Sequence, residues 1–236
     1  MTAARAMRIE EPAATSIAIA GEAALLDLSG ALYVSARETL VVADLHFEKG
    51  SAFARRGAML PPYDTAATLA NLRDAMLRYR PREVIALGDS FHDRRGPDRL
   101  GEADRAALAA LVGSAGWTWV VGNHDPDLPP GIGGRVVDEA SLGALVLRHH
   151  PRVGEPRELA GHLHPVAKVV LYGRGVRARA FLTDGERCIL PAFGSYAGGL
   201  NACDAAFRGL FPRGFTAHVI GRARTFAIGR SALCGD

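Results

Sequence analysis

Seven side chains of the kinds that bind metal ions lie in five short polar segments, each placed just after an apolar run. These residues are Asp44, His46, Asp89, Asn123, His149, His162 and His164. Carboxylate, amide and imidazole donors without thiolates favour Mn, Fe or Zn in a catalytic site over a structural zinc. The pattern therefore indicates a site for divalent metal ions.

The spacing within two of these segments favours a pair of ions. Asp44 and His46 are two residues apart, as are His162 and His164, and alternate residues of an extended segment point the same way. Two ions about 3.5–4 Å apart acidify a water and stabilise both oxygens of an in-line displacement. Such a pair needs a shared carboxylate, and Asp89, in the central segment, is the candidate.

The apolar runs before these segments predict the strands that must position them. Buried strands are expected at residues 40–43, 84–87, 117–121 and 144–147. Apolar residues at helical spacing predict helices at 64–80 and 102–112. After Gly161 the pattern predicts strands at 166–172, 177–182, 188–192, 215–220 and 225–228. Because ligand-binding residues collect beyond the carboxyl ends of strands in open α/β sheets, the five segments can converge on one crevice.

This order of elements predicts an α/β fold with two packed sheets flanked by helices, a four-layer αββα arrangement. The length of 236 residues favours a single domain, residues 1–236, with residues 1–15 as a flexible N-terminal tail. Gly88, Gly122 and Gly161 each stand beside a predicted ligand, and we expect them to let the backbone turn sharply there.

Composition narrows the class of protein. The net charge of +3 and the pI of about 9.0 are compatible with a polyanionic substrate but not with a nucleic-acid coat. The odd number of cysteines, 3, shows no C-x-x-C spacing and indicates neither a disulfide framework nor a thiolate site. The N-terminus has no hydrophobic signal core, so we expect a cytoplasmic protein that does not interact with membranes.

Taken together, the motifs resemble the complete series of the calcineurin-like metallophosphoesterases. The matching segments are Asp44-x-His46, Gly88-Asp89, Gly122-Asn123-His124-Asp125, His149 and Gly161-His162-x-His164. The resemblance implies a two-sheet sandwich flanked by helices. It also implies two metal sites that share Asp89, the first completed by Asp44, His46 and His164 and the second by Asn123, His149 and His162.

The same resemblance implies a catalytic role for His124, which would face the substrate and protonate the leaving oxygen or stabilise the transition state. Of the adjacent histidines, His149 is the expected ligand because of its place before the His-Pro step, and His150 is then left to contact substrate. The reverse assignment stays open.

Several further segments are similar to the bacterial DNA-ligase-associated metallophosphoesterases. They comprise residues 44–50, 88–93, 191–196, 198–201 and 211–215. This likeness implies an endonuclease of the DNA damage response. Its expected cofactors are two divalent ions, manganese first, with iron or zinc as alternatives. Its implied partners are DNA, an ATP-dependent DNA ligase, a ligase-associated helicase and an exonuclease.

One position departs from the phosphomonoesterases of the wider family. His92 stands where many of them have Asp, and the stretch resembles double-strand-break repair nucleases, whose corresponding His helps to expel the leaving group. We therefore expect His92 to be catalytic, the alternative being that it only orients Asp93 or His124. Arg94 and Arg95 follow and are candidates for binding phosphate, which keeps phosphomonoesterase activity open.

Three functions follow from these features: a DNA nuclease, a phosphohydrolase of nucleotides, cyclic nucleotides or pyrophosphate, and a non-enzymatic module on a decayed fold. The complete ligand set argues against the third. A nuclease needs an open basic groove, whereas a metabolite enzyme needs a closed pocket. The candidates for such a groove are Arg55, Arg56, Arg94, Arg95, Arg148 and Arg152, and a solvated surface is the alternative for each. Oligomeric state stays open.

Overall fold

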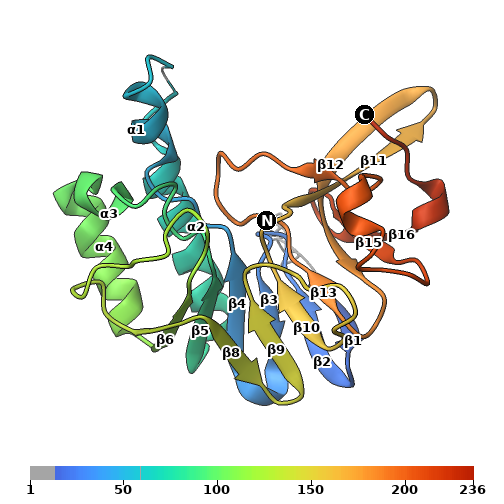
Figure 1. Ribbon diagram of the computed structural model, residues 1–236, viewed down its shortest axis with the longest axis horizontal. Coiled ribbons are helices and arrows are strands. Elements are labelled where there is room, and N and C mark those ends of the chain that lie inside the picture. The colour runs from blue at the N-terminus through green and yellow to red at the C-terminus, as the bar shows by residue number, and fades with distance from the viewer. Residues whose placement is uncertain (1–13, 59) are drawn as a thin grey trace, which may run out of the picture.

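The computed structural model describes residues 14–58 and 60–236 (Figure 1). Residues 1–13 of the predicted N-terminal tail lie outside the described residues, whereas Thr15, at its end, begins the first strand. No helix in the described ranges is both long and apolar enough to cross a membrane. Cys188, Cys203 and Cys234 are free thiols.

The first sheet has seven strands in the order β1-β2-β3-β4-β5-β6-β7. They are β1 (Thr15–Ile19), β2 (Glu22–Leu26), β3 (Leu32–Val34), β4 (Thr39–Ala43), β5 (Glu83–Leu87), β6 (Gly116–Val120) and β7 (Arg135–Val137). Strands β1 to β4 pair antiparallel, and β4 to β7 pair parallel. The carboxyl ends of β4, β5 and β6 therefore lie along one edge of this sheet.

The second sheet has nine strands, with the order β14-β11-β12-β13-β10-β9-β8; β15 also pairs with β12, and β16 pairs with β15. They are β8 (Glu139–Leu142), β9 (Leu145–Arg148), β10 (Glu158–Ala160), β11 (Pro165–Leu171), β12 (Arg174–Thr183), β13 (Cys188–Ile189), β14 (Leu200–Asn201), β15 (Thr216–Ile220) and β16 (Thr225–Gly229). Because β9 and β10 are parallel neighbours, their carboxyl ends also lie together.

Four α-helices and three short 3-10 turns complete the described fold. They are α1 (Lys49–Ala54), α2 (Asp64–Tyr79), α3 (Gly96–Arg99), α4 (Glu102–Gly113), η1 (Ser35–Arg37), η2 (Ala205–Phe207) and η3 (Arg230–Ala232). Helix α2 ends where Arg80 adopts a left-handed conformation, with Pro81 next in the chain. Leu69 and Leu72 of α2 and Leu108 of α4 pack on the outer face of the first sheet.

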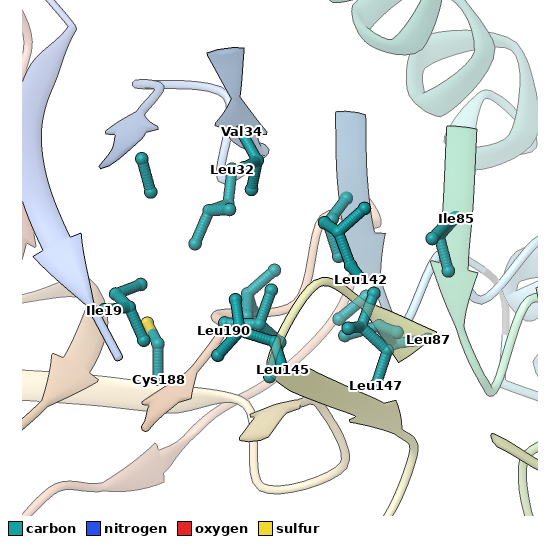
Figure 2. Close-up of a cluster of buried hydrophobic side chains, with 14 of the residues drawn as sticks. Ile19, Leu32, Val34, Ile85, Leu87, Leu142, Leu145, Leu147, Cys188 and Leu190 are labelled. Atoms are coloured by element: carbon teal, nitrogen blue, oxygen red, sulfur yellow. The ribbon is translucent and has the colours of Figure 1, made fainter. Parts of the chain in front are cut away.

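The main core lies between the two sheets. Figure 2 shows side chains from both sheets in it, including Ile85 and Leu87 of β5 and Leu142 and Leu147 of the second sheet. These four side chains are almost fully buried. Burying a side chain of this size contributes about 1.5–3 kcal/mol, so the two sheets hold each other face to face.

The outer face of the second sheet is covered by the C-terminal part of the chain (Figure 1). Phe207, Phe211 and Leu233 pack there against residues such as Leu182 and Ile189. The predicted two-sheet sandwich flanked by helices is thus confirmed, and η2 with the C-terminal segment supplies the fourth layer. Strand β13 is shorter than the predicted 188–192, because the chain after Ile189 turns towards the ends of the first sheet, where the Phe193 N–H donates to the Ala43 carbonyl.

Candidate metal centre

The seven predicted ligand residues meet where strands of both sheets end. Asp44 and His46 follow β4, Asp89 follows β5, Asn123 follows β6, His149 follows β9, and His162 and His164 follow β10. The centre therefore lies at the edge of the sandwich, between the two sheets. The ligands from the first sheet and those from the second can meet only because one sheet packs on the other.

The first group of donor atoms comes from Asp44, His46 and His164. Their ligand atoms all lie within 4.8 Å of one another. Nε2 of His164 is 3.1 Å from Oδ1 of Asp44 and 3.3 Å from Nε2 of His46. Two imidazole nitrogens at this distance can share at most one proton, whereas a cation between them would accept both lone pairs.

The second group surrounds Nε2 of His149. Oδ1 of Asn123 lies 3.0 Å from this nitrogen, Nδ1 of His162 lies 3.2 Å away and Oδ1 of Asp89 lies 3.4 Å away. The opposite nitrogen, Nδ1 of His149, donates to the carbonyl of Leu87 at 3.0 Å. That bond fixes the ring so that Nε2 faces the other donors, which is the usual way in which a metal-binding histidine is oriented.

Five of these residues have a backbone conformation that side chains other than glycine seldom adopt. The φ angles are +54° at Asp44, +46° at His46, +46° at Asp89, +68° at His162 and +45° at His164. A residue held in this region costs about 1–3 kcal/mol and persists only where surrounding contacts enforce it. Here the His162 N–H donates to Oδ2 of Asp44 at 2.9 Å and so ties the two sheets together.

The three predicted glycines are required for two different reasons. Gly88 has a φ of +70°, and an added Cβ would lie 2.4 Å from the His149 ring. Gly122 and Gly161 do not need a positive φ; a Cβ there would meet the main chain of Asp89 at 2.2 Å or Oδ2 of Asp44 at 2.6 Å. The prediction of sharp turns is thus confirmed at Gly88, while close approach of neighbouring groups explains the other two.

The surroundings of the proposed ligands shift several of their pKa values. Burial lowers the pKa of His46 to about 3. Burial, together with the nearby His150 and His149, lowers the pKa of His162 to about 4. Burial alone would raise the pKa of Asp89, but hydrogen bonds from His149 and His124 hold it below its usual range. Burial alone would lower the pKa of His149, but the carboxylates near that imidazole raise it instead. The lowered pKa values of His46 and His162 leave these rings with free lone pairs, which together with the Asp89 carboxylate fit divalent cations.

His124 lies at the edge of the centre and contacts two of its segments. Its main-chain N–H donates to Oδ1 of Asp89 at 2.9 Å, and its Nδ1 donates to the carbonyl of His92 at 2.6 Å. The rings of His92 and His124 stack with centroids 5.3 Å apart. Both predicted catalytic histidines therefore stand side by side, with Nε2 of His124 3.9 Å from Oδ2 of Asp89.

The four predicted substrate-binding arginines share one cavity of about 760 Å³ with these histidines. Its lining includes Arg55, Arg56, Arg94, Arg95, His92, Asn123 and His124. All four arginines are exposed, and the cavity is open on one side. Arg55 and Arg56 come from the segment after α1, and Arg94 and Arg95 from the loop before α3. Two separate segments, here called the two arginine walls, therefore bring them to the same cavity.

The adjacent histidines differ in burial, but both lie near the second donor group. His149 is buried within that group, whereas His150 is exposed and its ring lies against His162, with centroids 3.8 Å apart. A ring nitrogen of His150 lies within 4.8 Å of ligand atoms of His149 and His162, so the reverse assignment stays open. Arg148 is also turned away from the cavity, because it is buried in ion pairs with Glu155 and with Glu158 at 3.1 Å.

Asp125 is a residue of the site to which the sequence reasoning gave no role. Its Oδ1 accepts from the Gly122 N–H at 3.1 Å and its Oδ2 from the Phe91 N–H at 3.0 Å, so it joins the loops that carry Asn123 and Asp89. Burial raises the pKa of this carboxyl to about 6, although those hydrogen bonds oppose the shift. The sequence feature that could have identified Asp125 as a residue of the site is its place in the Gly122–Asp125 motif.

Among solved structures, the chain is similar to Pseudomonas putida nuclease MPE, with 30% sequence identity and a TM-score of 0.69, over 91% of this chain and 100% of that one. Protein AQ665 from Aquifex aeolicus, of unknown function, has 15% identity and a TM-score of 0.37 over 53% and 78% of the two chains. A predicted phosphoesterase from Streptococcus pneumoniae TIGR4 has 14% identity and a TM-score of 0.30 over 81% and 97%. No protein-family model and no curated protein matches the sequence.

The likeness to the Pseudomonas putida nuclease covers nearly the whole of both chains, and it includes sequence as well as fold. With the sandwich and the His/Asp centre in place, the chain belongs to the calcineurin-like metallophosphoesterases, and it is a metal-dependent hydrolase of phosphoester bonds.

Proposed function

We propose that this phosphoesterase is a nuclease that cleaves DNA. The observation that carries the proposal is the cavity beside the metal centre, which is lined by the proposed ligand Asn123, by His92 and His124, and by Arg55 with Arg56 and Arg94 with Arg95. Arginines are well suited to phosphate because their planar fork donates two parallel hydrogen bonds. The naming of the similar Pseudomonas putida protein as a nuclease supports the same substrate class.

The two donor groups are the basis for assigning two ions. Asp44, His46 and His164 with Asp89 would hold one, and Asp89, Asn123, His149 and His162 would hold the other. Bound ions would supply the nucleophile at neutral pH and neutralise charge that develops on the phosphate oxygens. Manganese is the proposed metal, with iron or zinc as alternatives, because carboxylate, amide and imidazole donors without thiolate suit these ions.

The residues of the chain then have separate tasks. The arginine walls bind phosphates on either side of the cleaved bond. His124 presents Nε2 to the scissile phosphate, since its Nδ1 is engaged by the His92 carbonyl. The His92 ring lies beside it. Burial and the charge of Lys49 lower the pKa of this ring to about 4, so it would protonate the leaving oxygen only with the negative charge of a bound phosphate beside it. His150, exposed beyond His162, contacts substrate at the rim.

The proposal extends to DNA repair in the cytoplasm, with a DNA ligase, a ligase-associated helicase and an exonuclease as partners. Its support is the resemblance of the motifs around residues 44–50, 88–93 and 191–201 to the ligase-associated group. Binding of a purified ATP-dependent DNA ligase from the same source organism, measured by calorimetry, would test the partnership.

An activity panel with Mn²⁺ tests the substrate. The wild-type protein would be given a chromogenic phosphomonoester, a chromogenic diester, cyclic nucleotides, pyrophosphate, and single- and double-stranded DNA. Cleavage of DNA, abolished by EDTA, is the expected result. Turnover of a nucleotide, a cyclic nucleotide or pyrophosphate with DNA left intact would instead identify a small-molecule phosphohydrolase.

A further inference from the structure

Arg99 lines the same cavity as the four exposed arginines, but its donors are already engaged. Nη1 and Nη2 donate to the two oxygens of Asp93 at 2.8 Å and 3.0 Å. Nε donates to Oγ of Ser51 at 2.8 Å, and Nη2 also reaches the carbonyl of Glu48 at 3.3 Å. With its side chain 13% exposed, Arg99 has little capacity left for a phosphate.

The other arginines of the cavity differ in this respect. Arg55, Arg56 and Arg95 have no ion pair within residues 14–58 and 60–236, and Arg94 meets only an exposed carboxylate, Asp127, at 3.5 Å. These four are free to bind an anion. Arg99 therefore serves a purpose other than adding positive charge to the groove.

The contacts of Arg99 connect the two walls of the groove. Ser51 lies within α1, which leads into Arg55 and Arg56, and its hydroxyl donates to Oε2 of Glu48 at 2.6 Å. Asp93 lies in the loop of His92, Arg94 and Arg95. We call the set Arg99, Asp93, Ser51 and Glu48 the latch.

The latch is anchored on the body of the protein. Glu48 is buried and begins α1 with a φ of +64°. Its Oε1 accepts from the Thr65 hydroxyl at 3.0 Å, and its N–H donates to the same hydroxyl oxygen at 2.9 Å. Thr65 belongs to α2, whose neighbouring residues pack on the first sheet. Without Arg99, the six-residue helix α1 would keep these contacts to α2 and the packing of Phe53 on the His92 ring, with centroids 5.6 Å apart. It would lose the hydrogen bonds that Arg99 makes to both walls.

We propose that Arg99 is a positioning residue that fixes the separation of the two arginine walls, so that both can bind phosphates of one nucleic-acid strand. The inference rests on the proposed function, because the separation matters only for a substrate that contacts both walls. A bidentate arginine–carboxylate pair suits this role, since it restricts orientation as well as distance.

The test is the steady-state cleavage of a DNA oligonucleotide with Mn²⁺ at salt concentrations from about 50 to 200 mM. Arg99→Gln should raise KM for DNA on the order of tenfold, with a much smaller change in kcat. The slope of log KM against log salt concentration should also fall, by the equivalent of up to about two phosphate contacts. In an Arg55→Gln/Arg56→Gln background, Arg99→Gln should add little, because the wall that it positions has already lost its charges.

Arg105→Gln is the matched control. Arg105 bonds the carbonyls of Pro97 and Leu100 at 2.8 Å and 3.4 Å, so it supports the same α3 region without contacting the latch. Its KM and salt dependence should stay at the wild-type values.

An unchanged KM in Arg99→Gln, or an equal loss in both backgrounds, would overturn the positioning role. If Arg99→Gln does not fold, Ser51→Ala removes only the α1 end of the latch and should still raise KM; a wild-type KM there would also overturn the role. Failure of the wild type to cleave DNA would instead overturn the proposed function, and the role of Arg99 with it.

Discussion

Nδ1 of His124 donates a hydrogen bond to the main-chain carbonyl of His92 at 2.6 Å. The bond leaves Nε2 of His124 as the nitrogen that can face a substrate. It also means that His124 is oriented by the main chain of His92 rather than by its side chain. The buried Nδ1 of the His92 ring has no hydrogen-bond partner among the described residues. The two imidazoles can therefore be altered separately.

This arrangement predicts different effects for the two alanine variants. His124→Ala should lower kcat on chromogenic esters and on DNA alike, by about 10²–10³-fold, as expected for the loss of a donor that stabilises charge on the phosphate in the transition state. His92→Ala keeps the carbonyl that orients His124. It should slow DNA cleavage far more than hydrolysis of a nitrophenyl ester, because nitrophenolate leaves without a proton and a deoxyribose hydroxyl does not.

The ratio of the two rates in each variant is the measurement. Metal content should stay near the wild-type value in both, since neither ring is assigned as a ligand. Equal losses on both substrates in His92→Ala would show that His92 acts only as support for its neighbours.

If the arginine wall beside α1 binds DNA phosphates, the affinity for DNA should depend on salt concentration. Replacing Arg55 and Arg56 together with Gln should reduce the slope of log affinity for DNA against log salt by about two phosphate contacts. Arg73→Gln with Arg82→Gln is the matched control, because these arginines are exposed and lie outside the cavity. Binding of DNA that does not respond to salt, even in the wild type, would contradict the proposed groove.

We expect substitution of Gly88 to lower both stability and metal content, because it combines backbone strain with a steric clash. Gly88→Ala would force alanine into a φ of +70° and push its Cβ against the His149 ring. Gly173→Ala has a similar φ, +74°, with nothing within 4 Å, so it isolates the strain of about 1–2 kcal/mol. We expect both variants to unfold more easily but only Gly88→Ala to lose metal, as measured by elemental analysis. Retained metal in Gly88→Ala would show that His149 can shift without leaving the centre.

Asp27 predicts a dependence of stability on pH. Burial would raise the pKa of its carboxyl, but hydrogen bonds from Ser29 and Tyr79 and the charge of Arg78 lower it below its usual value. A lowered folded-state pKa contributes stability above the unfolded pKa of 3.8, and this contribution is lost as the pH falls through the folded value.

Asp27→Asn should therefore destabilise the protein by about 1–3 kcal/mol at neutral pH, and the gap to wild type should close in acid. Urea unfolding of both proteins at a series of pH values measures this difference in the free energy of unfolding. A gap that is independent of pH would mean that the charge of Asp27 contributes nothing.

Local pattern was enough to predict the elements that carry most ligands. The buried strands before Asp44 and Asp89 contain continuous apolar runs, the strand before Asn123 is apolar except for Thr118, and α2 is bounded by prolines, so their types follow from short-range sequence. Strands β1 to β3 were not predicted, because residues 15–34 are rich in alanine and glycine and carry a weak strand signal.

The direction of individual side chains could not be predicted from the sequence. His149 and His150 are adjacent and alike, and only the packing of the second sheet on β5 determines which of them faces Asp89. Arg148 and Arg99 look like any other arginines in the sequence. Their burial depends on carboxylates that the fold brings close, Glu158 for the first and Asp93 for the second.

The most direct test of a two-ion centre that shares Asp89 is to measure the metal content and turnover of Asp89→Asn. As the proposed ligand shared by both ions, Asp89 should be more costly to neutralise than any exposed carboxylate. We predict two ions per chain in the wild type, and in Asp89→Asn fewer ions and a loss of DNA cleavage of about 10²-fold or more. Asp74→Asn, an exposed carboxylate on α2, should match the wild type. Two bound ions and undiminished turnover in Asp89→Asn would contradict the shared-carboxylate centre.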